Sequence, residues 1–279
     1  MSLSAASRSE VTKQFSTAAW WVLALVLVVY VGSTAAGLGA VLGASAAGKL
    51  SGANAPRLAA DTIVPVLYSL AASIGYVFPL LIGTLMVTAE FRHKTLTPTF
   101  LATPRRGRVL FAKVVVGILL GALYAVFAVI STVGPAAGVL TGFGIDTKLG
   151  ETNTWALLGR IVLAFIVWAL IGIGVGTLVR NQVAAIVIVL AFTQFIEPIA
   201  RVAASFVKGL SDVTRFFPGA ASDTLVGQSI YNSALASPGG TQAASSHPLE
   251  WWVGGLVLLG YAVVFLIVGY LASWRRDVS

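Results

Sequence analysis

Cysteine and charge are the two scarce features of this sequence. The 279 residues contain no cysteine and two histidines, and only 10% of them are Asp, Glu, Lys or Arg. The lack of cysteine excludes disulfide bonds, thiolate metal sites and a cysteine nucleophile. Because His93 and His247 lie far apart in the chain, we also expect no histidine-based metal cluster.

Apolar residues take the place of the missing charges. They make up 57% of the chain, and the mean hydropathy is +0.91, whereas soluble domains are about 45–50% apolar and about 25% charged. This composition indicates an integral membrane protein. The segment 1–18 lacks the small-residue cleavage site of a secretory signal, so we expect the first apolar run to be retained as a membrane span.

Six apolar runs are long enough to cross a bilayer, which takes about 20 residues of helix. Their continuous apolarity favours helices over the alternating strands of a membrane barrel, and six of the seven tryptophans lie at their ends, as in aromatic belts. Glycines 117, 121, 172, 174 and 176 are interpreted as helix-packing positions. The predicted fold is therefore a single all-α membrane domain, 1–279, with spans at 19–42, 62–89, 109–133, 155–179, 183–200 and 251–274.

The distribution of charge predicts the orientation of these spans. If both termini are cytoplasmic, the inner segments hold eleven Lys or Arg against three acids, a net charge of +8, and the outer segments hold seven of each, a net charge of zero. This asymmetry follows the positive-inside rule, so no nucleic-acid partner is needed to explain the basic pI of about 10.0. We expect segment 1–18 to be either an interfacial helix or a frayed terminus.

The polar segment 90–108, between the second and third spans, is predicted to form a cytoplasmic hairpin. Each of its arginines would cost about 2.5–3.5 kcal/mol at the centre of the bilayer. Thr97-Pro98 and Thr103-Pro104 each resemble an N-cap followed by a proline at the first helical position. The short helix between them would expose Phe100 and Leu101, either as a docking surface for a soluble partner or within a connector at the lipid headgroups.

The opposite face offers fewer candidate residues. Glu197 and Arg201 are spaced for a local ion pair. Arg160 is predicted to lie at the same outer level as Glu197, so a pair between these two residues across helices is an alternative. We expect these three residues to form either an outer gate or a structural anchor. Within the outer loop, 205–250, residues 220–234 are predicted to form a short half-inserted helix.

Three motifs, in order, resemble permeases of the ABC type-2 exporter family. The first joins Glu90, Arg92 and Thr95 to LATP at 101–104 and to a basic run that leads to Lys113. The second is the turn GVGTLVRNQVAA at 174–185, and the third is FFPGAASDTLVG at 216–227. The family resemblance implies a re-entrant outer segment between the last two spans and a coupling helix in the hairpin, which would be seated on a cytoplasmic ATPase.

The resemblance also implies function and partners. The chain would be the permease subunit of an exporter in a bacterial cytoplasmic membrane, working as a homo- or heterodimer with two ATPase subunits that carry ATP and Mg. It has no GxxxxGK[ST] loop, so we expect no enzyme activity and no cofactor of its own. The implied ATPase-coupling residues are Glu90, Arg92, Thr95, Leu96, Thr97, Pro98, Phe100, Leu101 and Pro104.

Other function classes remain open at this point. The apolar spans suit a hydrophobic or amphipathic substrate such as a drug, lipid or peptide. An ATPase-independent channel or ion-coupled transporter is the main alternative, although the spans lack a polar line at mid-membrane. A permease-like subunit that only anchors an ATPase is another. An intramembrane enzyme would need acids at membrane depth, where Glu197 is the one candidate.

Overall fold

The computed structural model describes residues 3–49, 60–102, 105–205, 211–228 and 250–274, and within these residues the fold is helical and contains no strand. Six segments of this part of the chain are long and apolar enough to span a membrane. The predicted all-α fold with six helices long and apolar enough to span a membrane is thereby confirmed. The spans are Ala19–Ala46, Thr62–Arg92, Arg106–Gly142, Thr152–Leu178, Gln182–Ala204 and Trp251–Ala272.

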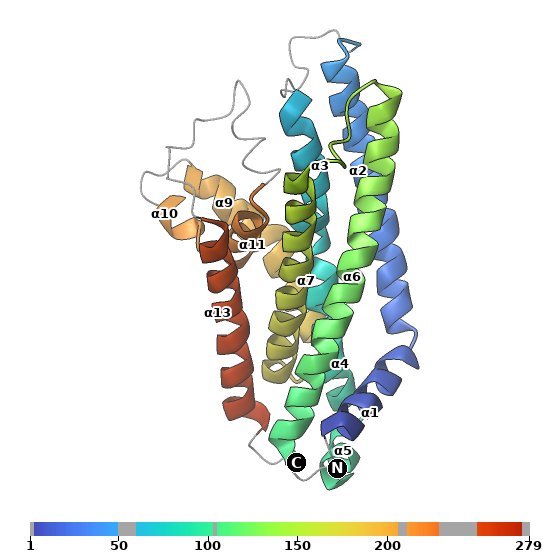
Figure 1. Ribbon diagram of the computed structural model, residues 1–279. Helices are drawn as coiled ribbons and strands as arrows, with labels where there is room; N and C mark the ends of the chain where they lie inside the picture. The colour runs from blue at the N-terminus through green and yellow to red at the C-terminus, as the bar shows by residue number, and fades with distance from the viewer. Residues whose placement is uncertain (1–2, 50–59, 103–104, 206–210, 229–249, 275–279) are drawn as a thin grey trace.

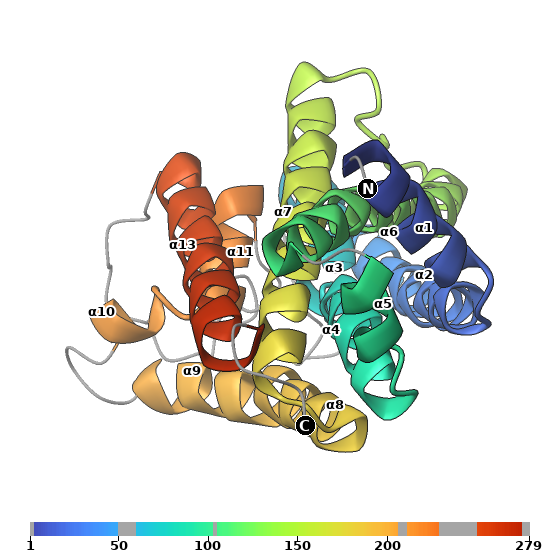
Figure 2. The same ribbon diagram turned by 90° about the horizontal axis from the view of Figure 1, so that it is seen from below.

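The spans run side by side, and short helices lie at both ends of the bundle (Figures 1 and 2). At one end, here called the α5 end, α1 (Leu3–Phe15) and α5 (Leu96–Ala102) lie beside the start of α6 (Arg106–Gly142). The π-helical turn η2 (Tyr270–Trp274), which follows α13 (Trp251–Gly269), reaches the same end, because Tyr270 lies beside Gly107. Both ends of the described chain therefore lie at the α5 end.

Helix α7 (Thr152–Leu178) is the centre of the bundle and packs against α4 (Val77–Arg92), α6 and α13. Glycine allows these backbones to touch. A Cβ on Gly172 would collide with the Leu80 carbonyl, and one on Gly83 would collide with the Ala169 carbonyl. The interpretation of the span glycines as packing positions is confirmed for this seam, where small residues let helices approach closely in a bilayer.

Two prolines affect their spans differently. The second span breaks at Tyr76 into α3 (Ala60–Gly75) and α4, because Pro79 has no N–H to donate to the Gly75 carbonyl four residues earlier. Helix α6 instead continues through Pro135 to Gly142, beyond the predicted boundary at 133. The Ser131 carbonyl, which Pro135 leaves without its helical donor, faces Gly32 of α2 (Ala19–Ala46). Close packing on α2 therefore keeps α6 continuous.

The fifth span is also irregular. It consists of α8 (Gln182–Ala191), a π-helical turn η1 (Phe192–Ile196) and α9 (Glu197–Ser205). After it come α10 (Ser211–Thr214) and α11 (Pro218–Val226). Helix α11 begins with Pro218 at its first turn and ends at Gly227, whose φ of 87° suits glycine. It is almost wholly buried against α13, α7 and α3. The predicted half-inserted helix at 220–234 thus begins earlier and ends at Val226, and residues 229–249 lie outside the described part.

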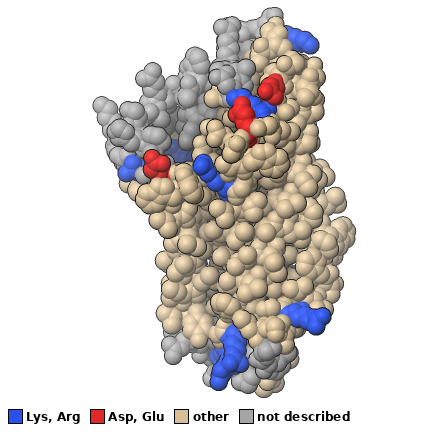
Figure 3. Space-filling view, in the orientation of Figure 1, with Lys and Arg blue, Asp and Glu red and all other residues tan. Residues whose placement is uncertain are grey.

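The outward faces of α2, α8, α9 and α13 carry large exposed apolar side chains. In Figure 3 the middle of the visible face is free of charged residues. Its α5 end shows only basic side chains, whereas its opposite end shows both signs. An apolar belt between two charged ends is the surface expected of a protein that crosses a bilayer.

Candidate functional site

Helix α5 stands at the end of the bundle as a short, partly exposed element. It follows α4 through Lys94, which adopts a left-handed φ of 55°. It begins at Leu96, one residue before the predicted cap at Thr97, and the Thr99 N–H donates to the Thr95 carbonyl at 3.2 Å. Leu96 is buried, whereas Leu101 is 78% exposed. One side of α5 therefore faces the bundle and the other faces solvent.

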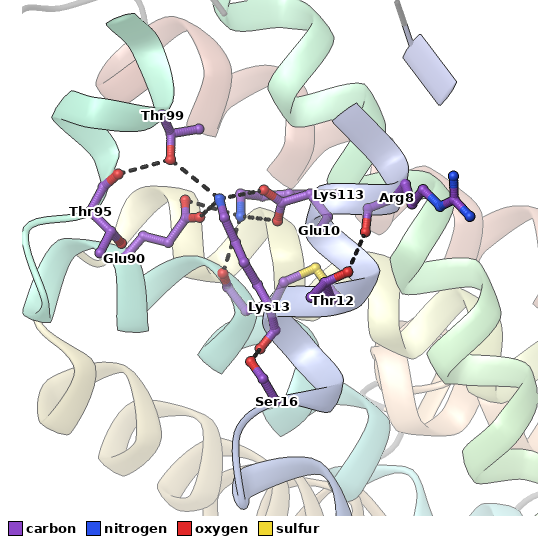
Figure 4. A network of polar contacts seen from close by, with 10 residues as sticks. Arg8, Glu10, Thr12, Lys13, Ser16, Glu90, Thr95, Thr99 and Lys113 are labelled. Carbon is purple, nitrogen blue, oxygen red and sulfur yellow. Dashed lines mark hydrogen bonds and ion pairs between the residues drawn. The ribbon is translucent and has the colours of Figure 1, made fainter. Parts of the chain in front are cut away.

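Four charged side chains close a ring next to α5 (Figure 4). The Lys13 ammonium lies 2.8 Å from Oε1 of Glu10 and 2.9 Å from Oε1 of Glu90. The Lys113 ammonium lies 2.7 Å from Oε2 of Glu10 and 3.0 Å from Oε2 of Glu90. Each lysine thus contacts both carboxylates, and the charges of the ring sum to zero.

The ring lies at the level where three helices meet, with Lys13 part-exposed and its other three members buried. Glu10 comes from α1, Glu90 from the last turn of α4, and Lys113 from α6, about 10 Å along the axis from the start of that helix at 1.5 Å per residue. Lys113 is 0% exposed and also donates to the Met86 carbonyl at 3.3 Å. A buried ammonium of this kind is tolerated only with such partners, and removing one partner of a buried ion pair costs about 3–5 kcal/mol.

The two ring members on α1 titrate away from their ordinary ranges. Burial raises the pKa of Glu10, but the ammonium groups of Lys113 and Lys13 outweigh burial and hold the pKa of this carboxyl below its usual value. Burial lowers the pKa of Lys13, but Glu10 and Glu90 outweigh it, so the pKa of Lys13 is raised. Both groups are therefore more strongly ionised in the folded protein than in an unfolded chain.

A hydrogen bond connects the ring to α5. Lys13 Nζ donates to the Thr99 hydroxyl at 3.2 Å, and the same hydroxyl donates to the Thr95 carbonyl at 2.8 Å. Phe100, the neighbouring residue, is half-buried and lies under the Arg106 guanidinium, 5.1 Å from ring centroid to Cζ. Helix α5 is thus tied both to α1 and to the start of α6.

The predicted coupling residues fall into separate groups. Glu90 lies in the ring, Thr95 and Leu96 anchor the start of α5, and Pro98 and Leu101 are exposed. Arg92 points away from α5 toward the turn between α7 and α8, where it donates to the Gln182 side chain at 3.4 Å. The side chain of Thr97 and residues 103–104, which include Pro104, lie outside the described part of the chain.

Sequence reasoning missed the ring itself. Lys113 was placed only as the end of a basic run, and Glu10 and Lys13 only as inner charges. The signal available was Lys113 alone inside an otherwise apolar span, since an ionisable residue there calls for a counter-ion. Glu10 lies 103 residues away in the chain, so spacing could not identify it as the partner.

A second polar cluster surrounds α11, toward the opposite end of the bundle. Glu197 Oε1 accepts from the Ala220 N–H at 3.1 Å, at the start of α11, where the helix dipole favours an anion. Asp223 accepts from Arg201 Nη2 at 2.8 Å and from the Ser73 hydroxyl at 3.2 Å. Span 5 therefore holds α11 through both of its charged residues.

Indole and phenol groups complete this cluster beneath α11. Trp168 Nε1 donates to the Ser222 hydroxyl at 3.0 Å, and the Tyr76 hydroxyl donates to the Thr193 carbonyl at 3.0 Å, within the π-helical turn η1. The two rings stack with centroids 4.5 Å apart. The break in span 2 and the irregular turn in span 5 thus meet at the same place.

The predicted partnership of Arg160 with Glu197 is not what the structure shows. The Arg160 guanidinium lies over the Trp251 ring at 4.7 Å, a cation–π contact, while Glu197 is used by α11. Glu197 accepts from the Ala220 N–H and Arg201 donates to Asp223, so both residues bind α11. The reason is the position of α11 between the two spans, which the sequence alone does not reveal.

Ion pairs, hydrogen bonds and stacked rings hold the two clusters together. Within the described residues, no group of three or more His, Asp or Glu side chains could hold a metal ion. No protein-family model matches the chain, and no curated protein sequence is significantly similar to it. The geometry of α5, the charged ring and the α11 cluster is therefore what any statement of function must rest on.

Proposed function

We propose that this chain is the membrane-spanning permease subunit of an ATP-driven exporter of the ABC type-2 kind, and that a separate ATPase contacts it at α5. The observation that carries the proposal is the set of contacts between α5 and the charged ring. There, an exposed apolar residue, Leu101, stands on a helix that is bonded through Thr99 to Lys13 of the charged ring, and the ring includes Lys113 of the third span. The three sequence motifs, in order, also support it.

In this proposal the α5 end faces the cytoplasm of a bacterium. The excess of basic residues at that end supports this orientation. Two copies of the permease would pair with two ATPases that supply ATP and Mg, and the substrate would be hydrophobic or amphipathic. The chain itself would bind no nucleotide and catalyse no reaction.

The ring would transmit a displacement of α5 to the spans. If the ATPase displaces α5, Thr99 moves with it, and so does the ammonium of Lys13, which also holds Glu10 and Glu90. Those carboxylates hold Lys113 in the third span. An ATPase that contacts α5 differently in two nucleotide states would thereby bias two arrangements of α1, α4 and α6.

The α11 cluster is proposed as the outer gate. Opening would separate α11 from Glu197 and Arg201, which hold its first turn and its Asp223. Arg160 would lie at the edge of the gate, where its guanidinium contacts the Trp251 ring. Export that is unchanged in Glu197→Gln and in Arg160→Gln would exclude the gate.

The permease role is tested by affinity purification of the tagged chain from its native membranes in mild detergent. We expect one ATP-binding-cassette ATPase to accompany the wild type and to be lost with Leu101→Asp, because a charge would replace the most exposed apolar side chain of α5. The matched control is Ser9→Asp, which adds the same charge at an exposed position of α1.

The control variant is expected to retain the ATPase. Loss in both variants would point to a general charge effect and not to α5 as the contact. If no ATPase accompanies even the wild type, under conditions that preserve membrane complexes, the alternative of an ATPase-independent channel or ion-coupled transporter replaces the proposal.

A further inference from the structure

A hollow at the α5 end lies apart from the charged ring. It has a volume of about 500 Å³ and is lined by residues from two places: the end of α4, with Phe91 and Arg92, and the turn into α8, with 180–183. Both linings come from points where a span ends. The hollow therefore opens at the level where an apolar bilayer core would give way to headgroups.

The polar side of the hollow is suited to an anion. Arg92 and Arg180 both line it and are both exposed. Asn181 and Gln182 add side-chain amides, and Gln182 Oε1 holds the Arg92 guanidinium at 3.4 Å. Guanidinium groups bind phosphate with two parallel hydrogen bonds, and amides supply neutral donors beside them.

The apolar side continues down the outside of α8. Val183 lines the hollow and is 64% exposed, and Val187, one turn further along, is 58% exposed. Leu190 follows on the same helix and is also exposed. Spacings of four and three residues keep these side chains on one face of the helix. A polar hollow is thus continuous with an apolar stripe that faces outward.

We propose that this hollow is a binding site for the headgroup of an anionic phospholipid, whose phosphate lies between Arg92 and Arg180 and whose acyl chains run along Val183 and Val187. A free phosphate would use the arginines but not the stripe. A zwitterionic lipid would use the stripe, but its ammonium would face two guanidinium groups. The combination selects a lipid with net negative charge.

The site does not depend on an ATPase partner or on transport. It lies on the opposite side of α4's last turn from the ring, because Glu90 faces α1 and α6 while Arg92 faces α8. A lipid bound there would join the α4 end to the turn between α7 and α8.

Native mass spectrometry of the purified full chain tests the site. The protein is mixed with phosphatidylglycerol or with phosphatidylcholine, and the lipids retained per chain are counted. We expect the wild type to retain phosphatidylglycerol preferentially and the double variant Arg92→Gln, Arg180→Gln to lose about tenfold in affinity for it. The matched control is Arg105→Gln, Arg108→Gln, which removes the same charge at exposed positions of the same end outside the hollow.

Each outcome decides the proposal. Equal loss in both double variants would show a diffuse charge effect and overturn it, as would equal retention of the two lipids by the wild type. Displacement of the lipid by inorganic phosphate at comparable concentration would show that the hollow binds phosphate without the acyl chains. That result would also overturn the proposal. The lipid preference of the wild type is independent of whether the variants fold.

Discussion

The charged ring at the α5 end and the polar cluster around α11 both bury carboxylates, but they neutralise them in different ways. In the ring, Glu10 and Glu90 each face two ammonium groups. In the α11 cluster, Glu197 faces the backbone N–H of Ala220 at a helix start. The ring is held by charge against charge, whereas the α11 cluster combines charge against dipole at Glu197 with the ion pair between Arg201 and Asp223.

This difference suggests different mechanical roles. A closed ring of alternating charges resists the removal of any member, because each loss leaves an unbalanced buried charge. A carboxylate bound at a helix start can lose that contact at the cost of roughly one charge-assisted hydrogen bond. In the proposed permease, the ring would therefore stay closed while it moves as a unit, and the α11 cluster would be the place that opens.

The largest effect is expected from breaking the ring at Lys113. Lys113→Met leaves Glu10 and Glu90 with a single shared ammonium, so we expect a loss of about 3–5 kcal/mol of stability. The loss of stability is measured by thermal unfolding in detergent, monitored by circular dichroism.

A second substitution sharpens that test. Adding Glu10→Gln to Lys113→Met restores a net charge of zero, so the double variant should recover part of the loss. Simple additivity of the two single variants would contradict a closed ring, because members of one network couple.

A smaller effect is expected at α11. Glu197→Ala removes the acceptor of the Ala220 N–H and should cost about 1–3 kcal/mol, because a buried donor is left unsatisfied. Glu197→Gln keeps an acceptor oxygen and should cost less. The readout is hydrogen–deuterium exchange of residues 218–226. Equal exchange in wild type and Glu197→Ala would mean that Glu197 does not hold α11.

The pH dependence of stability tests the charged ring through Glu10. The pKa of Glu10 is lowered in the folded protein, so its ionised form stabilises the fold above its ordinary pKa of about 4.3, and that contribution is lost as the pH falls through the folded-state value. The unfolding temperature of the wild type should therefore fall more steeply in acid than that of Glu10→Gln. Parallel curves would show that Glu10 is not held ionised by the lysines.

The smallest stability effect is expected from Thr99→Ala, which removes the hydrogen bond between α5 and Lys13 but no charge. A loss of about 0.5–1.5 kcal/mol fits the part-buried hydrogen bond to Lys13. The second bond of the hydroxyl, to the Thr95 carbonyl, adds little because that carbonyl still accepts from the Thr99 N–H. Stimulation of a co-purified ATPase by substrate should nevertheless decrease, since the tie to the ring is cut. Unchanged stimulation would remove Thr99 from the coupling route, and Thr12→Ala, on the exposed side of α1, is the matched control.

The six spans were predictable because a bilayer imposes length and apolarity on each span separately. The helix at the centre of the polar hairpin was also predictable, although it begins at Leu96 and not after Thr97. The extension of α6 through Pro135 was not, because it depends on Gly32 in another helix. Local propensity ends a helix at such a proline, and tertiary packing overrides it here.

The sites were less predictable than the spans for the same reason. Glu90 was identified by motif, but its partners Lys13 and Lys113 lie in two other helices. Arg160 and Glu197 were correctly placed toward the same end, but α11 intervenes between the predicted partners and takes Glu197 for its own first turn. Pairs of side chains from different helices depend on which helices face each other, and the apolar runs of the sequence do not indicate this.

The position of Lys113 in the ring also bears on how the protein enters the membrane during synthesis. Its partners, the hydrogen-bond acceptors Glu10 and Met86 and the ion-pair partner Glu90, all precede it in the chain. When the third span leaves the ribosome, the groups that neutralise its ammonium have already been made, so this lysine can enter the bundle together with its counter-ions. The order of the residues along the chain is thus also an order of assembly, and insertion of the third span would depend on α1 having been translated first.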